Sequence, residues 1–488
     1  MTTRSLSLTA LLLLGACTVG PDYAGPPATA SDAVARGTFA RAADPAFTPA
    51  PGLARWWEGL NDPLLDRLVD DALVHSPSID LAVARVREAQ AQLSQQRAAL
   101  KPSASANATV IGAELPPIQP GSGSTQVEFY NVGANASWEL DLFGGGRRSI
   151  EQFRATGDAR LADLADVQVS LSAAVAQAYV ALRDVQARIA LSDATTRLQQ
   201  QQLTLTRQRL AAGTASQLSV ERLQTQLENT QAQAIPLAAQ RDEYWNQLAV
   251  LTGRTPGALD ATLKPVAPVP LPPAQVAVGD PASLIAHRPD VRAAERQLAA
   301  STAGVGVAKA RALPGIRFLG LLGLGGTSPG DIFDLGNIAA IAAPSLSWSF
   351  LDFGKNRAAT RVSEAQRDQA DATYRKTVLD ALQDAETALS RYGNSRKQLG
   401  QLVQAEATAK RATALNRQRV TAGTTTLIDQ LDVERQQLSA TAAVTQARAQ
   451  LTQYYIAVNK ALGLGWTDPV SADAGRSATA ATPSAPAR

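Results

Sequence analysis

The sequence of 488 residues is poor in the side chains that build catalytic and metal sites. It contains two histidines, one cysteine and one methionine, which leaves almost no ligands for a metal ion and few nucleophiles. Aromatic residues make up 5% of the chain, and a net charge of +3 gives no electrostatic case for nucleic acid. The composition therefore argues against an enzyme. It predicts no cofactor, no metal site and no nucleic-acid partner.

The mature chain also lacks a hydrophobic run long enough to cross a bilayer as a helix, which takes about 20 apolar residues. Residues 6–14 form a shorter apolar segment, preceded by Arg4 and followed by small residues up to Ala16. This is the pattern of a signal peptide over residues 1–16. If the mature chain enters a membrane, it must do so as β-structure, because backbone polar groups in lipid have to be paired.

The only cysteine, Cys17, directly follows the predicted cleavage site. An unpaired thiol is unusual in an exported protein, and an attached acyl chain adds about 0.8 kcal/mol of membrane affinity per buried methylene. We therefore predict that Cys17 is the lipid-attachment residue of a lipoprotein. The alternative is an ordinary signal peptide that happens to contain a cysteine. Threonine rather than aspartate at position 18 favours sorting to the outer membrane, by analogy with other lipoproteins.

The sequence contains an internal duplication. Trp138 and Trp348 lie in similar surroundings 210 residues apart, and Gly213 and Gly423 are separated by the same interval. A period this long indicates a duplicated half rather than a short solenoid repeat. The predicted divisions are a signal peptide (1–16), an extended N-terminal segment (17–52), a first structural repeat (53–253), a proline-rich linker (254–281), a second structural repeat (282–465) and a disordered tail (466–488).

Each half is predicted to contain a pair of strands. Residues 103–110 and 132–142 alternate apolar and polar side chains with the period of two that indicates a strand with one apolar face. Residues 345–350 alternate in the same way, and 316–325 form a less regular partner. A length of about ten residues suits a tilted membrane-spanning strand. The alternative is a soluble sandwich, which would need further strands.

Long helices follow each strand pair. Residues 147–212 and 355–422 contain no proline and are rich in Ala, Gln, Leu and Arg, which are mostly good helix formers. Their apolar residues recur at alternating intervals of four and three, which is a coiled-coil period. Gly213 and Gly423, each followed by Thr, indicate a helix stop and a new cap. Each half is therefore predicted to form a long antiparallel helical hairpin with its tip at the glycine. A shorter helix, at 79–100 or 291–311, precedes each strand pair.

Four strands cannot close a membrane barrel, because closed membrane barrels need at least about eight. An open edge in lipid would leave backbone groups unsatisfied, at several kcal/mol each. The strand count therefore predicts an oligomer. The predicted fold class is α+β: a membrane β-barrel to which each chain gives four strands, continued by a long α-helical coiled-coil barrel, with internal duplication.

Several short motifs occur in a specific order along the mature chain. They are Cys17 followed by Gly20-Pro21-Asp22-Tyr23, the Trp56-Trp57 pair, the repeated Phe143-Gly144 and Phe353-Gly354 blocks, and the two tip motifs at 209–214 and 419–424. With these motifs the chain resembles a TolC-type outer-membrane factor of the OprM/NodT lipoprotein branch over nearly all of its mature length. The resemblance implies a homotrimer with a twelve-stranded barrel in the outer membrane and a helical tunnel through the periplasm.

The resemblance also implies a function. It predicts a passive, gated exit duct for drugs or toxic compounds in a tripartite efflux system. Its partners would be a periplasmic adaptor, an inner-membrane pump of the RND class and the lipid of the outer membrane. A duct for type I protein secretion or metal-ion export has the same architecture and is the alternative. A periplasm-spanning coiled coil without a pore is the alternative from a different class.

Candidate site residues follow from the same resemblance. Asp429 and Asp432 lie six and nine residues after Gly423, where the family has acidic pore-constriction residues; the alternative is two solvated aspartates on a helix surface. The first half has Ser219 in place of Asp429, so the predicted acidic ring comes mainly from the second hairpin. The predicted adaptor contacts are the tip residues Arg209, Gly213, Thr214, Arg419, Gly423 and Thr424.

Four other side chains are candidates for a functional or structural role. Trp138 and Trp348 lie on apolar strand faces, where they would either join an aromatic girdle at the membrane interface or pack inside the trimer. His75 and His287 are related by the repeat, and each is followed by an X-Pro sequence at a helix start. We interpret both histidines as turn residues without a metal role.

Overall fold

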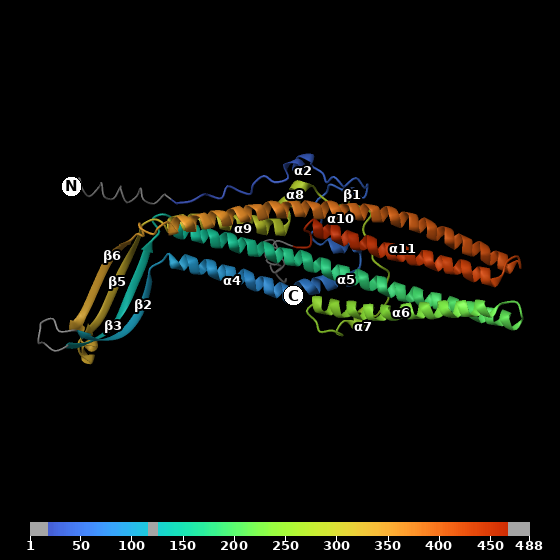
Figure 1. Ribbon diagram of the computed structural model, residues 1–488, viewed down its shortest axis with the longest axis horizontal. Coiled ribbons are helices and arrows are strands. Elements are labelled where there is room, and N and C mark those ends of the chain that lie inside the picture. The colour runs from blue at the N-terminus through green and yellow to red at the C-terminus, as the bar shows by residue number, and fades with distance from the viewer. Residues whose placement is uncertain (1–17, 116–124, 467–488) are drawn as a thin grey trace, which may run out of the picture. The chain divides into compact units, whose positions relative to one another are not determined.

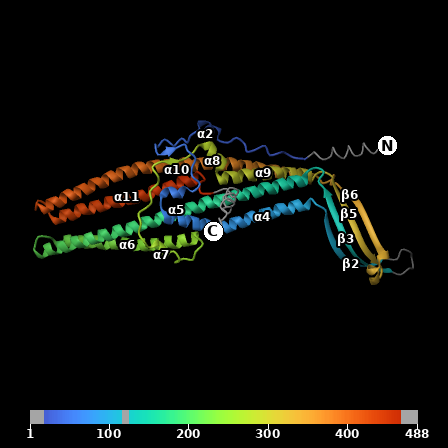
Figure 2. The ribbon, with the colours of Figure 1, turned by 180° about the vertical axis from the view of Figure 1, so that it is seen from behind.

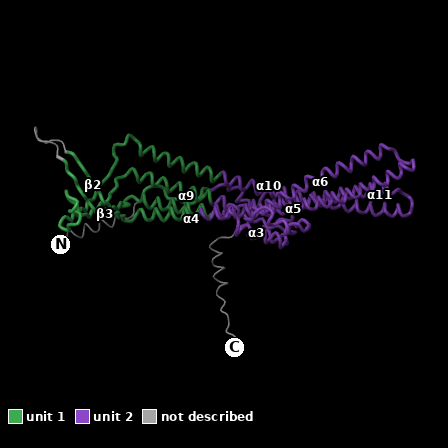
Figure 3. The backbone as a smooth tube through the Cα atoms, turned by 90° about the horizontal axis from the view of Figure 1, so that it is seen from below, with its two compact units in different colours: residues 1–27, 85–161, 293–375 green, residues 28–84, 162–292, 376–488 purple. Residues whose placement is uncertain are grey.

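The structure is a computed structural model that describes residues 18–115 and 125–466 (Figure 1). The predicted signal peptide, Cys17, the first strand-connecting loop and all of the predicted tail except Trp466 lie outside the described residues. The chain divides into two compact units, coloured separately in Figure 3. Unit 1 is Met1–Pro27, Arg85–Leu161 and Ala293–Arg375; unit 2 is Ala28–Ala84, Ala162–Arg292 and Lys376–Arg488. Each unit therefore contains matching pieces of both halves of the sequence.

Unit 1 contains a four-stranded antiparallel sheet in the order β2-β3-β5-β6 (Figure 1). Its strands are β2 (Ser103–Leu115), β3 (Thr125–Leu140), β5 (Gly315–Gly326) and β6 (Ile338–Ser347). Each half supplies two strands, as predicted, and the central β3–β5 pairing joins the halves with Trp138 opposite Phe318. The outer edges of β2 and β6 carry no further strand among the described residues.

One predicted strand is displaced in the structure: the alternation covers 345–350, whereas β6 begins earlier, at Ile338, and also ends earlier. The alternation at 345–350 predicts a strand that includes Trp348, but β6 ends at Ser347, which pairs with Gly315 at the start of β5. Pro314 precedes Gly315, and a proline has no N–H with which to continue the ladder. Trp348 therefore lies just beyond the strand. The connection from β5 to β6 forms two short 3₁₀ helices, η2 (Pro329–Phe333) and η3 (Leu335–Asn337), where a loop is predicted.

The helices that precede and follow the strands agree with the sequence pattern. These are α4 (Pro77–Ala99), α9 (Pro289–Ala310), α5 (Gly145–Ala211) and α10 (Lys355–Thr421). Asp141 accepts hydrogen bonds from the backbone N–H groups of Gly146 (2.8 Å) and Arg147 (3.0 Å). Asp352 accepts them from Gly354 and Asn356, at 2.9 Å each. The two aspartates thus satisfy N–H groups that have no partner within the first helical turn.

By length and composition, α5 is the one helix of the described chain that could cross a membrane. However, 56% of its most apolar stretch is buried within the fold, and a core helix passes the same test.

Unit 2 contains the two helical hairpins. Helix α6 (Gln217–Leu251) runs alongside α5, and α11 (Leu427–Ala461) runs alongside α10, in both views of the ribbon (Figures 1 and 2). The predicted seam is largely buried: Val175, Leu182, Val378 and Leu389 are fully buried, whereas Ile189 and Leu382 are half-buried. The sustained intervals of four and three therefore mark the side chains that pack within the hairpins.

The extended segments outside the repeats contact each other in unit 2. Strand β1 (Phe47–Thr48), near the N-terminus, pairs in parallel with β4 (Val276–Ala277) in the proline-rich linker. Nothing in the sequence pattern predicted this pairing. The short helices α2 (Ser31–Arg36), η1 (Trp56–Leu60), α3 (Pro63–His75), α7 (Asp260–Leu263) and α8 (Pro281–His287) were not predicted either.

Candidate functional site

One face of the sheet is almost entirely apolar. The register places the even-numbered residues of β3 beside the even-numbered residues of β5. Val132, Trp138, Phe318 and Leu322 on this face are between 40% and 51% exposed. Large side chains exposed together indicate a surface made for a partner or for lipid. We call this surface the even face.

The even face has aromatic residues at two levels of β3. Trp138 and Tyr130 are eight residues apart on this strand, which is about 27 Å of extended chain. At a strand tilt of about 40° the two side chains differ in height by about 21 Å, close to the apolar band of about 25 Å in outer-membrane barrels. The indole N–H of Trp138 donates to the Leu100 carbonyl (3.0 Å), and that of Trp348 donates to the Ala312 carbonyl (3.3 Å).

The opposite face, which we call the odd face, has two kinds of lining. On β2 and β3 the part nearest the helices is polar and carries Ser103, Ser105, Asn107, Asn131, Asn135 and Ser137, whereas Ile111 and Phe129, which pair further along these strands, are apolar and exposed. On β5 and β6 it is apolar: Leu321 and Ile341 lie in register with Asn135, and Leu319 lies beside Ser137. The three apolar side chains are 45% (Leu319), 37% (Leu321) and 60% (Ile341) exposed. The alternation of the first half predicted the polar lining but not this apolar strip.

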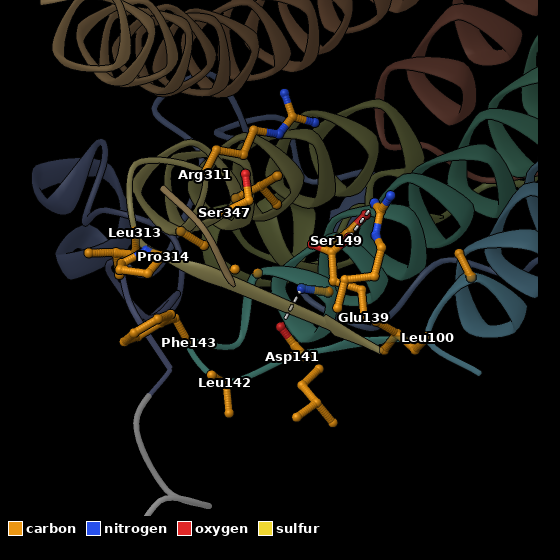
Figure 4. Close-up of a pocket in the computed structure, with 18 of the residues that line it drawn as sticks. Leu100, Glu139, Asp141, Leu142, Phe143, Ser149, Arg311, Leu313, Pro314 and Ser347 are labelled. Carbon is orange, nitrogen blue, oxygen red and sulfur yellow. Dashed lines mark hydrogen bonds and ion pairs between the residues drawn. The ribbon is translucent and has the colours of Figure 1, made fainter. Parts of the chain in front are cut away.

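An open cavity of about 580 Å³ lies where the strands of unit 1 meet its helices (Figure 4). Glu139 and Arg317, both on the odd face, line it and form an ion pair of 2.9 Å. Asp141, which caps α5, lies beside them, and Arg311 borders the cavity from the end of α9 (Figure 4). The cavity therefore adjoins the odd face, and its lining mixes these charged groups with apolar side chains such as Leu100, Leu142 and Phe143.

The two hairpin tips have the same backbone geometry. Gly213 and Gly423 adopt φ angles of 71° and 70°, a left-handed conformation that favours glycine at the end of a helix. The backbone N–H of Thr214 donates to the Arg209 carbonyl (2.8 Å), and that of Thr424 donates to the Arg419 carbonyl (2.9 Å). Each threonine hydroxyl donates to the same carbonyl at 3.1 Å.

The guanidinium groups of Arg209 and Arg419 form no ion pair within the described part of the chain.

Asp429 is exposed and caps the start of α11. Its carboxylate accepts hydrogen bonds from the Thr426 hydroxyl (2.7 Å), the Thr426 N–H (3.1 Å) and the Thr425 hydroxyl (3.0 Å). These hydrogen bonds, with a smaller contribution from the charge of Arg209, lower the pKa of Asp429. Asp432 is also exposed and forms an ion pair with Arg435 at 3.1 Å. The capping role of Asp429 is one that the sequence did not suggest.

The interiors of the two tips differ in chemistry. In the first hairpin, Leu203 and Val220 are buried in an apolar cluster. Their equivalents 210 residues later are Thr413 and Gln430, both 4% exposed. Gln430 accepts a hydrogen bond from Asn416 (3.0 Å) and donates one to Glu434 (2.8 Å).

A matched contact across each hairpin shows the same difference. Arg207 donates to the neutral Gln224 (3.0 Å), whereas Arg417 forms an ion pair with Glu434 (2.9 Å). The sequence pattern of one half does not reveal these pairs, but the 210-residue offset between the halves does.

The two histidines end helices. His75 is the last residue of α3 and His287 the last of α8. A ring nitrogen of each lies near the carbonyl oxygen four residues earlier, at 3.1 Å and 2.8 Å. Both rings thus face the ends of their own helices.

Comparisons with known proteins agree with this geometry. The model of the family "Outer membrane efflux protein" matches residues 68–254 and 281–464, one match in each half. The solvent efflux pump outer membrane protein SrpC of Pseudomonas putida is 30% identical over 470 residues, with 95% of this chain and 98% of SrpC covered. The pyoverdine export outer membrane protein OpmQ of Pseudomonas aeruginosa is 32% identical, with 96% and 98% covered.

A solved structure of the outer-membrane channel OprN is similar throughout. It has a TM-score of 0.84 and 34% sequence identity, and the match covers 92% of this chain and 100% of that one. The α+β fold, the duplication and the resemblance to TolC-type outer-membrane factors are thereby confirmed. The chain belongs to the outer membrane efflux protein family.

Proposed function

We propose that three copies of this chain close one twelve-stranded barrel in the outer membrane. As a family member, the chain is an outer-membrane channel subunit of a tripartite efflux system, which works with an adaptor and an inner-membrane pump. The observation that carries the trimer is the four-stranded sheet with an apolar even face and two unpaired edges. Pairing β6 of one copy with β2 of the next would satisfy both edges.

Three further assignments belong to this proposal. The first is that Cys17 carries the lipid anchor. The second is that Arg209, Gly213 and Thr214, with their equivalents Arg419, Gly423 and Thr424, contact the adaptor of an RND-class pump. The unpaired guanidinium groups of the two arginines support this role. The third is that Trp138 and Trp348 mark the membrane interface, which the exposure of both rings supports.

We also propose that Asp429 and Asp432 form the acidic gate. In a trimer they would place six carboxylates around the pore, and such a ring attracts cations. Both side chains are exposed, and the hydrogen bonds that keep Asp429 ionised favour a permanent charge at this position.

The odd face favours lipophilic cargo, because it would line the barrel. Leu319, Leu321 and Ile341 would form one apolar strip per subunit, next to polar strips from β2 and β3. Contact with such a strip removes apolar surface of the solute from water, which is favourable, whereas a fully polar wall offers no such gain. The relatives named for solvent and toluene efflux are consistent with cargo of this class.

The test is complementation of a strain that lacks its own outer-membrane channel but has the matching pump and adaptor. The wild-type chain should restore resistance to apolar and hydrophilic compounds. Leu319→Ser with Leu321→Ser should lower resistance to apolar compounds about fivefold, equivalent to roughly 1 kcal/mol of lost apolar contact. Resistance to hydrophilic compounds should not change.

The control is Ala343→Ser, which lies on the same face opposite Leu319 and removes no large apolar side chain. Failure of the wild-type protein to restore any resistance, although it reaches the outer membrane, would contradict the efflux function. Equal loss for both classes of compound would contradict the role of the apolar strip.

A further inference from the structure

The first described residues of the mature chain are held against unit 1 by a set of specific contacts. We call residues 18–23 the leader segment. Its Val19 N–H donates to the Phe143 carbonyl at 3.0 Å, in the turn between β3 and α5. Arg148, near the start of α5, donates to the carbonyls of Val19 (3.3 Å) and Gly20 (3.4 Å). The leader segment is thus bound through its backbone, close to the end of a strand.

Arg148 is the centre of these contacts. Only 5% of the residue is exposed, and it forms ion pairs with Asp22 of the leader segment and with Glu151 (2.7 Å). A buried guanidinium is stable only when its donors are used and its charge is balanced. The leader segment provides one carboxylate and two carbonyls for this purpose. Removing it would leave a buried cation with part of its hydrogen bonding unmet.

Three glycines allow the backbones to touch. A side chain at Gly144 would come within 2.7 Å of the Thr18 side chain, and one at Gly306 would come within 2.9 Å of the Val19 carbonyl. Gly20 adopts a φ of 100° and packs directly on Gly306. Backbone contacts this close require the absence of Cβ atoms on both sides.

Tyr23 fixes the other end of the leader segment. Its hydroxyl donates to Glu295 at 2.9 Å, and its ring packs against the buried alanine cluster that includes Ala155 and Ala299. The guanidinium of Arg296 lies 5.7 Å from the ring centre, within the range of a cation–π contact. Both ends of a six-residue segment are therefore anchored to the same unit.

We propose that these contacts form a seat for the lipid anchor, with Arg148 as its positioning residue. The inference rests on the proposed lipid attachment at Cys17, whose Cα is one residue, or about 3.8 Å, from that of Thr18. The seat would fix the acyl group beside the β3–α5 turn, so that its depth in the membrane is set by the sheet.

The alternative is a leader segment that is not bound to the protein, so that the position of the lipid anchor varies. The 13 residues from Thr18 to the start of α2 would then have a root-mean-square reach of about 20 Å. That distance is most of the thickness of the hydrocarbon core, which is about 30 Å. The seat would fix the position of the acyl group relative to the sheet. It would play no part in the acylation reaction itself.

The experiment uses the full lipoprotein in outer-membrane vesicles with a nitroxide label at Ala24→Cys, an exposed position next to Tyr23. The acylated Cys17 does not react with the label. Arg148→Gln should raise the ratio of mobile to immobile label about tenfold, the effect of losing one charge-assisted hydrogen bond. Asp22→Asn should act in the same direction, and its carboxylate is too exposed (85%) for the change to disturb the core.

Arg147→Gln is the matched control, because Arg147 precedes Arg148 but pairs with Asp141 instead of the leader segment. It should leave the label immobile. Cys17→Ser should also leave the label immobile, since the seat is made by protein contacts. The proposal is overturned if the label stays immobile in both Arg148→Gln and Asp22→Asn, or becomes mobile in Cys17→Ser.

Mass spectrometry of the N-terminal peptide tests the lipid attachment at Cys17 separately from the seat. An acyl mass on Cys17 in the wild type, Arg148→Gln and Asp22→Asn supports a seat that acts after acylation. A wild-type peptide without acyl mass overturns the lipid attachment itself, whatever the label shows.

Discussion

Asp429 combines a structural role with a negative charge in one side chain. Its carboxylate accepts three hydrogen bonds at the start of α11, as an N-terminal cap requires. In the first hairpin, Ser219 stands at the same position and its hydroxyl lies 2.9 Å from that of Ser216. Both halves keep an N-cap hydroxyl, that of Ser216 in α6 and that of Thr426 in α11, whereas the reciprocal, charged contact of Asp429 is made only in the second half. We expect that difference to be visible in ion selectivity.

The first prediction concerns how the ion selectivity of the channel depends on pH. Because the pKa of Asp429 is lowered, its carboxylate should stay charged as the pH falls from 7, and lose its charge only below the usual aspartate value of about 3.9. The ratio of cation to anion permeability, from reversal potentials in a salt gradient, should therefore be constant between about pH 7 and pH 5.

Asp429→Asn, which keeps a capping side chain, should lower the permeability ratio at every pH in this range. Ser219→Asn is the matched control and should leave the ratio as it is. An unchanged ratio in Asp429→Asn would show that this carboxylate does not face the ion path.

The sequence identified these residues as candidates but could not predict their hydrogen-bond partners. The interval from Gly423 located Asp429 and Asp432, whereas the hydrogen bonds from Thr425 and Thr426 depend on side-chain rotamers. The same holds for Trp138 and Trp348. Alternation or repetition singled them out, but only the structure shows that both indoles bind carbonyls at the ends of preceding helices.

Among the elements, the regular ones could be predicted and the irregular ones could not. The two 67-residue helices and the strands β2 and β3 have many repeated positions, so a pattern of period 3.5 or 2 identifies them. Most of β6 is apolar on both faces, so alternation identified only its end. The β1–β4 pairing involves two residues on each side, which is too short for any period. The end of β6 depends on Pro314, which precedes the neighbouring strand β5 and is not visible in the pattern of β6 alone.

The hairpin tip offers a prediction at the scale of an element. At Gly423 the left-handed φ of 70° costs a residue with a side chain about 1–2 kcal/mol. Gly423→Glu should therefore distort the tip and weaken coupling to the adaptor, with a loss of resistance of about tenfold. The measurement is drug susceptibility at equal amounts of assembled protein.

Gly400→Glu, in the helix that ends just before Gly423, provides the control. Gly400 lies in the middle of α10 with open space around its missing side chain. A glutamate there should be accepted without loss of resistance. Equal resistance in the two variants would count against the tip as an adaptor contact.

For the whole molecule, the open sheet is the feature that demands explanation. Its even face is apolar and exposed, its odd face is partly polar, and its two edge strands are unpaired among the described residues. A lone sheet of this kind would aggregate in water and leave polar groups unpaired in lipid. Assembly into a closed barrel accounts for all of these properties, and it makes the odd face the wall of a pore.

The most direct test of a pore is single-channel recording of the purified protein in planar lipid bilayers. The account predicts discrete, cation-selective conductance steps, with more open channel in Asp429→Ala with Asp432→Ala, because the proposed gate carboxylates are removed. Absence of conductance in both the wild type and this double variant, with intact oligomers present in the bilayer, would contradict the pore.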